Sequence, residues 1–325
     1  MMMNGDEARK FGEKSLADVQ VTDLNSVLKS LRLIHLSTTN QSTYFTIPPL
    51  DSLLLPSSTH PPILSLVSPP SAHQPSGSGK TSLVTLIIAT ALSTTTSNAI
   101  ILIDPLHHFS IPLLSSTLLR IFSSTSTHPP PSPSAVKEKV RNALHHLHIL
   151  HPTTFPTLIS TLRSLPPYLF TPTAHPSTHR TIHSLILEDT DAFLPTLPST
   201  STPASASATL SFHLLNLSNM LSCAIITTSR AKSARYLRPA MPMWDRDVRE
   251  TRVALRKVEA TKFGAGLSLD EVERETAESW AVVREGCCEA SRVSGAGVQQ
   301  ASTGPPFLIN IGVNGVEIKD KEKNK

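Results

Sequence analysis

One short glycine-rich stretch carries residue types that bind phosphate. The segment at 74–82 reads Q-P-S-G-S-G-K-T-S, and its Gly79-Lys80-Thr81 end matches the last three positions of a phosphate-binding loop. Glycines let successive backbone N–H groups turn toward an anion, and the positive end of the following helix dipole points at the same anion. In such a loop Lys80 reaches the β- and γ-phosphates, and the Thr81 hydroxyl binds Mg²⁺.

The loop therefore predicts ATP and Mg²⁺ as cofactors. The first glycine of the pattern is replaced by Gln74, which keeps these contacts but strains the approach to the loop. The alternative is a Ser/Gly-rich turn that precedes Lys-Thr by chance, but an apolar run before the loop and an apolar helix after it favour phosphate binding. The expected ATP contacts are Ser76, Gly77, Ser78, Gly79, Lys80, Thr81, Ser82, Asp104 and Ser229.

Two adjacent carboxylates follow another apolar run, L-I-L-E-D at 185–189. A P-loop ATPase holds Mg²⁺ partly through an acidic residue at the end of a neighbouring strand. We predict Asp189 as the metal ligand beside Thr81, with Glu188 as the alternate, and take both as the candidate catalytic residues. An acidic residue that merely ends a buried strand is the competing interpretation.

Two further strand ends carry polar side chains. Asp104 ends A-I-I-L-I-D, where it either lies near the γ-phosphate or caps the strand. Thr228 and Ser229 end C-A-I-I-T-T-S, where a residue that senses the γ-phosphate would lie, although a hydroxyl-rich strand end needs no such role.

Apolar strands that alternate with helices predict an α/β fold with a mostly parallel central sheet covered by helices on both faces. The expected strands lie at 63–67, 99–104, 148–150, 184–188, 223–228, 252–257 (an edge strand) and 307–311, which is the last. The expected helices lie at 81–92, 113–122, 135–146, 155–165 and 209–221, with a helical piece near 269–284.

The chain divides into three predicted parts. Residues 1–40 form a short N-terminal extension with one helix at 21–33, residues 41–318 form the ATP-binding core, and 319–325 form a charged tail. We expect long disordered insertions near 123–134, 194–208 and 265–306, because the first two are rich in Ser, Thr and Pro and the third departs from the strand–helix pattern.

Composition excludes several classes of protein. The 325 residues include three cysteines without regular spacing, which argues against a disulfide framework or a zinc site. No apolar run has transmembrane length, and the charged N-terminus is unlike a secretory signal. The net charge of +4 permits nucleic-acid binding without requiring it.

The positive charge is concentrated at 230–262. Arg235, Arg238, Arg246 and Arg249 are candidates for DNA binding, because arginine binds phosphates bidentately and stacks on bases. A solvated basic loop is the alternative. The histidines at 145, 146, 148 and 151 have no acidic or cysteine partners beside them, so we expect a helix-to-strand surface rather than a metal site.

In their order and spacing, the motifs resemble the RecA-type core of the eukaryotic recombinase and its DNA-repair paralogues. The resemblance covers roughly residues 40–318 with long insertions. It rests on P-P-L-D-S-L-L-L at 48–55, P-S-G-S-G-K-T-S-L at 75–83, A-I-I-L-I-D at 99–104, L-I-L-E-D-T at 185–190, C-A-I-I-T-T-S at 223–229, R-P-A-M-P-M-W at 238–244, T-R-V-A-L-R-K at 251–257 and F-L-I-N-I-G-V-N-G-V at 307–316.

The resemblance implies a nuclear factor in homologous recombination and DNA repair. Such a factor acts with other recombinase paralogues, or the recombinase itself, on single-stranded or branched DNA and on no membrane. Two departures affect catalysis: Leu106 stands where the family has its general-base Glu, and Ser229 replaces the Gln of the sensor strand. We therefore expect ATP binding with weak or no hydrolysis. An inactive scaffold of recombinase ancestry and a DNA-independent P-loop NTPase remain the alternatives.

Overall fold

The computed structural model describes residues 43–55, 61–70, 77–94, 97–124, 132–233, 237–245, 247–258, 268–293, 306–312 and 314–319. The predicted extension at 1–40, with its helix, lies outside these residues, and so does the predicted tail apart from Lys319.

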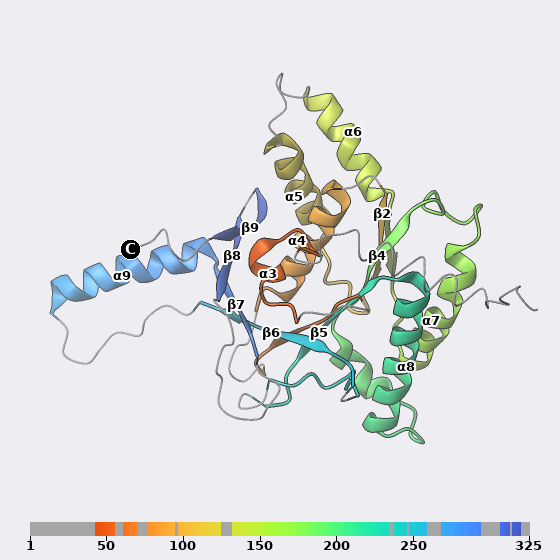
Figure 1. Ribbon diagram of the computed structural model, residues 1–325. Helices are drawn as coiled ribbons and strands as arrows, with labels where there is room; N and C mark the ends of the chain where they lie inside the picture. The colour runs from red at the N-terminus through yellow and green to blue at the C-terminus, as the bar shows by residue number, and fades with distance from the viewer. Residues whose placement is uncertain are drawn as a thin grey trace, which may run out of the picture. The chain divides into compact units, whose positions relative to one another are not determined.

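Nine strands form one sheet in the order β3-β2-β4-β5-β1-β6-β7-β8-β9 (Figure 1). The first six in this order pair in parallel and the last three are antiparallel, which confirms an α/β fold with a mostly parallel central sheet. The strands are β1 (Ile63–Ser68), β2 (Asn98–Ile103), β3 (Leu147–Leu150), β4 (Thr181–Leu187), β5 (Ala224–Arg230), β6 (Glu250–Lys257), β7 (Cys288–Arg292), β8 (Phe307–Gly312) and β9 (Gly315–Lys319).

Helices cover both faces of the parallel part. The chain moves from β1 toward the β3 edge through three helices and returns to β5 through two. Because crossovers between parallel strands are right-handed, opposite directions of travel place the two sets on opposite faces, as Figure 1 shows. The first set is α4 (Lys80–Thr94), α5 (Ile111–Ser124) and α6 (Pro133–Leu144), and the second is α7 (Phe155–Leu169) and α8 (Pro203–Leu221).

Two hydrophobic clusters follow from this arrangement. Successive residues of β2 alternate between them: Ile100 and Leu102 pack with the face of α4, whereas Ile101 and Ile103 pack with the face of α7 and α8. Strands buried on both faces read as continuous apolar runs, which is why their positions were predictable from the sequence.

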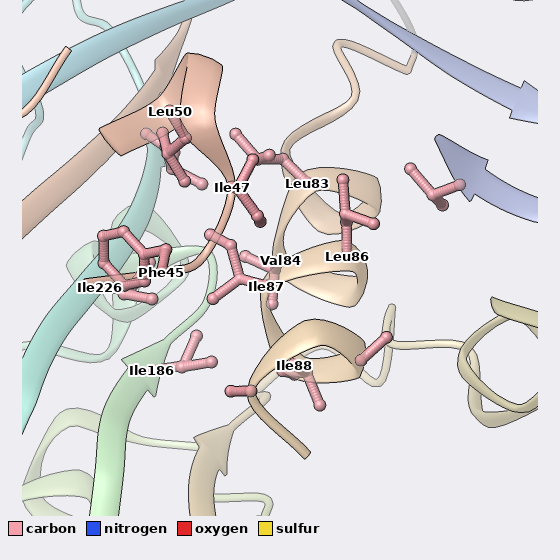
Figure 2. Packing of buried hydrophobic residues seen from close by; sticks show 14 of the residues in the cluster. Phe45, Ile47, Leu50, Leu83, Val84, Leu86, Ile87, Ile88, Ile186 and Ile226 are labelled. Carbon is pink, nitrogen blue, oxygen red and sulfur yellow. The ribbon is translucent and has the colours of Figure 1, made fainter. Parts of the chain in front are cut away.

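The segment before β1 packs over the α4 side of the sheet. Figure 2 shows Phe45, Ile47 and Leu50 beside the α4 residues Leu83 and Ile87, and all five are buried. Leu50 belongs to a single helical turn, α3 (Pro48–Asp51).

The Asp of the 48–55 motif holds this turn in place. The two carboxylate oxygens of Asp51 accept hydrogen bonds from the backbone N–H groups of Phe45, at 2.8 Å, and Ile47, at 3.0 Å. The motif therefore holds the buried side chains of Phe45, Ile47 and Leu50 against α4, the helix that follows the glycine-rich loop.

The antiparallel part corrects three predictions. Residues 252–257 are not an edge strand, because β6 lies between β1 and β7. Its alternation reflects partly exposed arginines between buried residues, a pattern that an interior strand also shows when one face is less covered. Strand β7 lies within the 265–306 insertion that we expected to be disordered, and β9 continues the sheet beyond the predicted last strand. The helical piece is confirmed as α9 (Leu269–Glu285).

The 194–208 insertion is also ordered, contrary to the prediction. A 3-10 turn, η1 (Thr190–Thr196), buries Phe193, and α8 begins at Pro203. The Thr202 hydroxyl accepts the Ser205 N–H at 3.1 Å, and proline at the first helical position has no N–H to satisfy. The Ser/Thr/Pro composition thus concealed a capped helix start.

The two ends of the 123–134 insertion belong to helices. Residues 123–124 end α5 and Pro133 begins α6, whereas 125–131 lie outside the described residues.

Candidate nucleotide-binding site

Described residues that were predicted to bind the nucleotide and the metal ion lie at or just beyond the ends of four strands, at one edge of the sheet. Strands β1, β2, β4 and β5 are parallel, so their carboxyl ends share that edge. The crossovers that leave β1 and β4 pass over opposite faces, and in open α/β sheets ligands bind in the crevice outside the carboxyl ends at such a reversal.

The glycine-rich loop has the backbone that an anion cradle needs. Gly77 and Gly79 adopt positive φ values of 61° and 85°, and α4 begins immediately afterwards at Lys80. A Cβ on Gly79 would lie 2.8 Å from both the Cβ and the Sγ of Cys288 in β7, so only glycine fits there. Ser76 lies outside the described residues.

The Lys80 ammonium lies over the end of β1. Its Nζ donates to the Ser68 hydroxyl at 3.0 Å and to the Ser78 hydroxyl at 3.5 Å. Burial lowers the pKa of Lys80, while the nearby carboxylates of Asp189 and Asp191 raise it. A partly desolvated cation held by two neutral hydroxyls is suited to an anionic ligand such as phosphate.

Glu188 is a buried carboxylate that interacts with the Thr81 hydroxyl but makes no hydrogen bond of normal geometry. It has no exposed surface, and neither side-chain oxygen is hydrogen-bonded within the described part of the chain. Burial, followed by the charges of Asp189 and Asp104, raises its pKa to about 8, and the Thr81 hydroxyl and Lys80 oppose this shift. Such an unsatisfied group requires an explanation, and a cation shared with Thr81 would supply one.

Asp189 is held in an unusual geometry. Its φ of 44° lies in the left-handed region, and its backbone N–H donates to the Thr228 hydroxyl at 2.8 Å. Its Oδ2 accepts a hydrogen bond from Nδ1 of His108 at 2.9 Å. The sequence did not single out His108, because 81 residues separate it from Asp189 and only the pairing of β2 with β4 brings them together.

Asp104 caps the loop that follows β2. Its carboxylate oxygens accept the backbone N–H groups of His108, at 3.2 Å, and Phe109, at 3.0 Å. This geometry corresponds to the cap, one of the two roles that the sequence left open. Leu106, where the resemblance implies a glutamate, is 43% exposed at the same loop.

Thr228 and Ser229 belong to β5, which lies between β1, the strand before the glycine-rich loop, and β4, the strand before Glu188 and Asp189. Strand β5 pairs with β1 on one side and β4 on the other, and Ser229 is in register with Val67. Ser229 is buried, and Thr228 fixes Asp189 through the hydrogen bond described above.

The oxygen-bearing side chains at this edge fit a magnesium ion that would be bound by the protein and by the phosphates of a nucleotide together. Within the described residues, no group of three or more His, Cys, Asp or Glu side chains could hold a metal ion. Mg²⁺ usually takes one or two protein carboxylates and completes its shell with water and substrate phosphates. The unpartnered Glu188, with Asp189 and Thr81, supplies that smaller donor set.

The candidate DNA-binding arginines are only partly described. Arg238 and Arg249 are exposed, whereas Arg235 and Arg246 lie outside the described residues. Trp244 packs against the α7–α8 hydrophobic cluster, so it contributes to the core.

The histidine run is partly buried, contrary to the predicted surface. His145 and His151 are exposed, but His146 and His148 are each 7% exposed. Both bond to the Ser177 hydroxyl, at 2.8 and 3.0 Å, which is a polar network that residues distant in the sequence complete.

Comparisons with known proteins do not identify a family. No family model matches this chain, and no curated protein matches its sequence.

None of the helices in the described residues is both long enough and apolar enough to cross a membrane.

Proposed function

We propose that this protein binds ATP with Mg²⁺ through the loop at 76–82, as a RecA-type P-loop protein. The observation that carries the proposal is the unpartnered Glu188 carboxylate, buried beside Lys80 and Thr81 at the start of α4. If the loop bound no ligand, the free-energy cost of burying this carboxylate would not be offset by any interaction with a cation. The positive-φ glycines and the start of α4 provide the complementary anion site.

The site residues have distinct roles in this proposal. Backbone N–H groups of the loop hold the phosphates, Lys80 turns from Ser68 toward the β- and γ-phosphates, and Thr81 with Asp189 or Glu188 holds the metal ion. A magnesium ion held there would neutralise negative charge on the bound phosphates.

We propose that hydrolysis is weak or absent. Leu106 and Ser229 stand where the resemblance implies a general-base Glu and a sensor Gln. Glu188 is a poor substitute, because it is fully buried and is itself a candidate ligand of the metal ion.

The cellular role rests on the resemblance and on the basic segment. We propose a nuclear factor of homologous recombination and DNA repair that works with recombinase paralogues or the recombinase on single-stranded or branched DNA. The exposed guanidinium of Arg238 supports contact with phosphates.

Calorimetric titration of ATP in MgCl₂ tests the nucleotide site. We expect wild-type protein and an exposed-helix control, Lys137→Ala, to bind alike. We expect Lys80→Ala to bind on the order of 100-fold more weakly, because a charge-assisted contact contributes about 2–3 kcal/mol. Absence of ATP binding by the wild-type protein would refute the proposal and leave a scaffold of recombinase ancestry.

Turnover and DNA binding on the same samples test the remaining claims. We expect little phosphate release and a salt-dependent affinity for single-stranded DNA, with a salt slope that decreases by about one when Arg238 is replaced by alanine. Rapid turnover without any DNA affinity would instead indicate a DNA-independent NTPase.

A further inference from the structure

We infer that His108 is a positioning residue that orients the Asp189 carboxylate toward the metal ion. The inference rests on the proposed function, and it assigns a role to a residue that the nucleotide-binding motif does not contain. Nδ1 of His108 lies 2.9 Å from Asp189 Oδ2. A carboxylate can only accept a hydrogen bond, so Nδ1 carries the proton and donates it.

The loop that carries His108 is built to hold this histidine in one place. The buried Asp104 carboxylate accepts the His108 backbone N–H, and the Asp104 carbonyl accepts a bond from Nδ1 of His151 at 2.7 Å. His107 takes no part in these two hydrogen bonds: its backbone adopts a φ of 55°, and its ring stacks on that of His151 with centroids 4.0 Å apart. His108 is thus fixed from its backbone, although about half of its side chain is exposed.

Asp189, which accepts the hydrogen bond from His108, is itself held through its backbone. The Asp189 backbone is held in the left-handed region by the bond from its N–H to Thr228, which sets the direction of its side chain. The bond from His108 then holds the Asp189 carboxylate in one orientation, with Oδ2 bonded to the imidazole, so that Oδ1 is the oxygen that would contact the metal ion. A donor behind a metal-binding carboxylate is the usual device by which proteins orient such ligands.

Stability alone gives little reason for this contact. The His108 side chain is 53% exposed, and pairs of that kind contribute little to folding because water and salt screen them. Its consequence lies at the site, where the metal ion needs a carboxylate in one orientation. Loss of such an outer partner typically weakens metal affinity on the order of 10- to 100-fold.

The test separates binding of the metal ion from binding of the nucleotide. ATP affinity is measured by calorimetry in EDTA and at stepped MgCl₂ concentrations, for the wild-type protein, His108→Ala and His108→Asn. We expect His108→Ala to require 10- to 100-fold more Mg²⁺ for half of the magnesium-dependent gain in ATP affinity, with binding in EDTA unchanged. The Asn variant should restore the wild-type dependence, since its amide N–H can replace Nδ1–H.

A neighbouring histidine provides the matched control. His107→Asn removes an imidazole from the same loop, Asn tolerates the positive φ, and no contact to Asp189 is lost. We expect this variant to match the wild type, with melting temperatures recorded for all variants.

The Mg²⁺ requirement and the ATP affinity in EDTA together distinguish failure of the positioning role from failure of the proposed function. An unchanged Mg²⁺ requirement in His108→Ala, or an equal loss of ATP affinity in EDTA and in Mg²⁺, overturns the positioning role while the proposed function stands. A wild-type protein that binds no ATP in either condition overturns both.

Discussion

The two ends of the parallel sheet bury ionisable groups in opposite ways. At the amino ends of β3 and β4, His146 and His148 share the Ser177 hydroxyl, and His148 also bonds to Tyr168 at 3.0 Å. At the carboxyl ends, Glu188 has no exposed surface and both of its oxygens lack a partner within the described residues.

The difference shows that burial alone does not mark the candidate site: among the described side chains with buried polar atoms that lack a partner, only Glu188 has two such atoms. The histidine cluster is a nearly closed network, in which only His175 Nε2 is buried without a partner among its described atoms. Such a network stabilises the fold. A desolvated carboxylate near a desolvated lysine and two positive-φ glycines instead offers groups that are suited to a cation and an anion.

The largest effect is expected from Gly79→Ala at the carboxyl edge. The new Cβ would meet Cys288 at 2.8 Å in a backbone that already favours glycine. We expect a loss of about 3 kcal/mol in the free energy of unfolding, together with loss of ATP binding. Urea denaturation and calorimetry measure both quantities.

Gly77→Ala is the matched control for that variant. Gly77 also has a positive φ, but a Cβ there meets nothing within 4 Å, so only backbone strain of about 1 kcal/mol is expected. Equal losses in the two variants would show that contact with Cys288 does not shape the loop.

Glu188→Gln should change the pH dependence of stability. The folded-state pKa of Glu188 is about 8, against an ordinary value of 4.5, so between these values the native protein holds a proton that the unfolded chain has released. The free energy of unfolding therefore falls as pH rises through this window, by at most about 1.4 kcal/mol per pH unit. The amide removes this contribution, which denaturation at pH 5 and pH 8 measures; an unchanged slope would mean that Glu188 is already ionised.

His148→Gln should have the smallest effect and the opposite pH dependence. Burial lowers the pKa of His148 from 6.5 to about 4, so the unfolded chain takes up a proton first as pH falls. The free energy of unfolding decreases from about pH 6.5 to pH 4, and the variant loses this contribution along with about 1 kcal/mol from altered hydrogen bonds. ATP affinity should not change; a marked loss would contradict the separation of the two ends.

The sequence predicted the elements that carry the site better than the site's internal contacts. Continuous apolar runs located β1, β2, β4 and β5, so Asp104, Glu188 and Asp189 were expected at strand ends, where the structure has them. The contact between His108 and Asp189 depends on which strands pair, and that information is absent from local patterns.

Strand β7 and the start of α8 were not predicted because of their local sequences. Strand β7 reads C-E-A-S-R, which is short and lacks an apolar run, and it is stabilised by its partners β6 and β8. The start of α8 had a Thr cap and a first-turn proline, but they lie in a Ser/Thr/Pro-rich stretch that resembles a disordered loop.

Hydrogen exchange of the backbone amides, followed by mass spectrometry with and without ATP and Mg²⁺, tests the central claim most directly. We expect slower exchange in peptides that contain Gly79–Leu83 and Glu188–Asp189, with no change in peptides that contain His146–His148 or Ser177. Protection at the histidine cluster alone, or no protection at saturating ATP, would contradict the assignment of the nucleotide site to the carboxyl edge of the sheet.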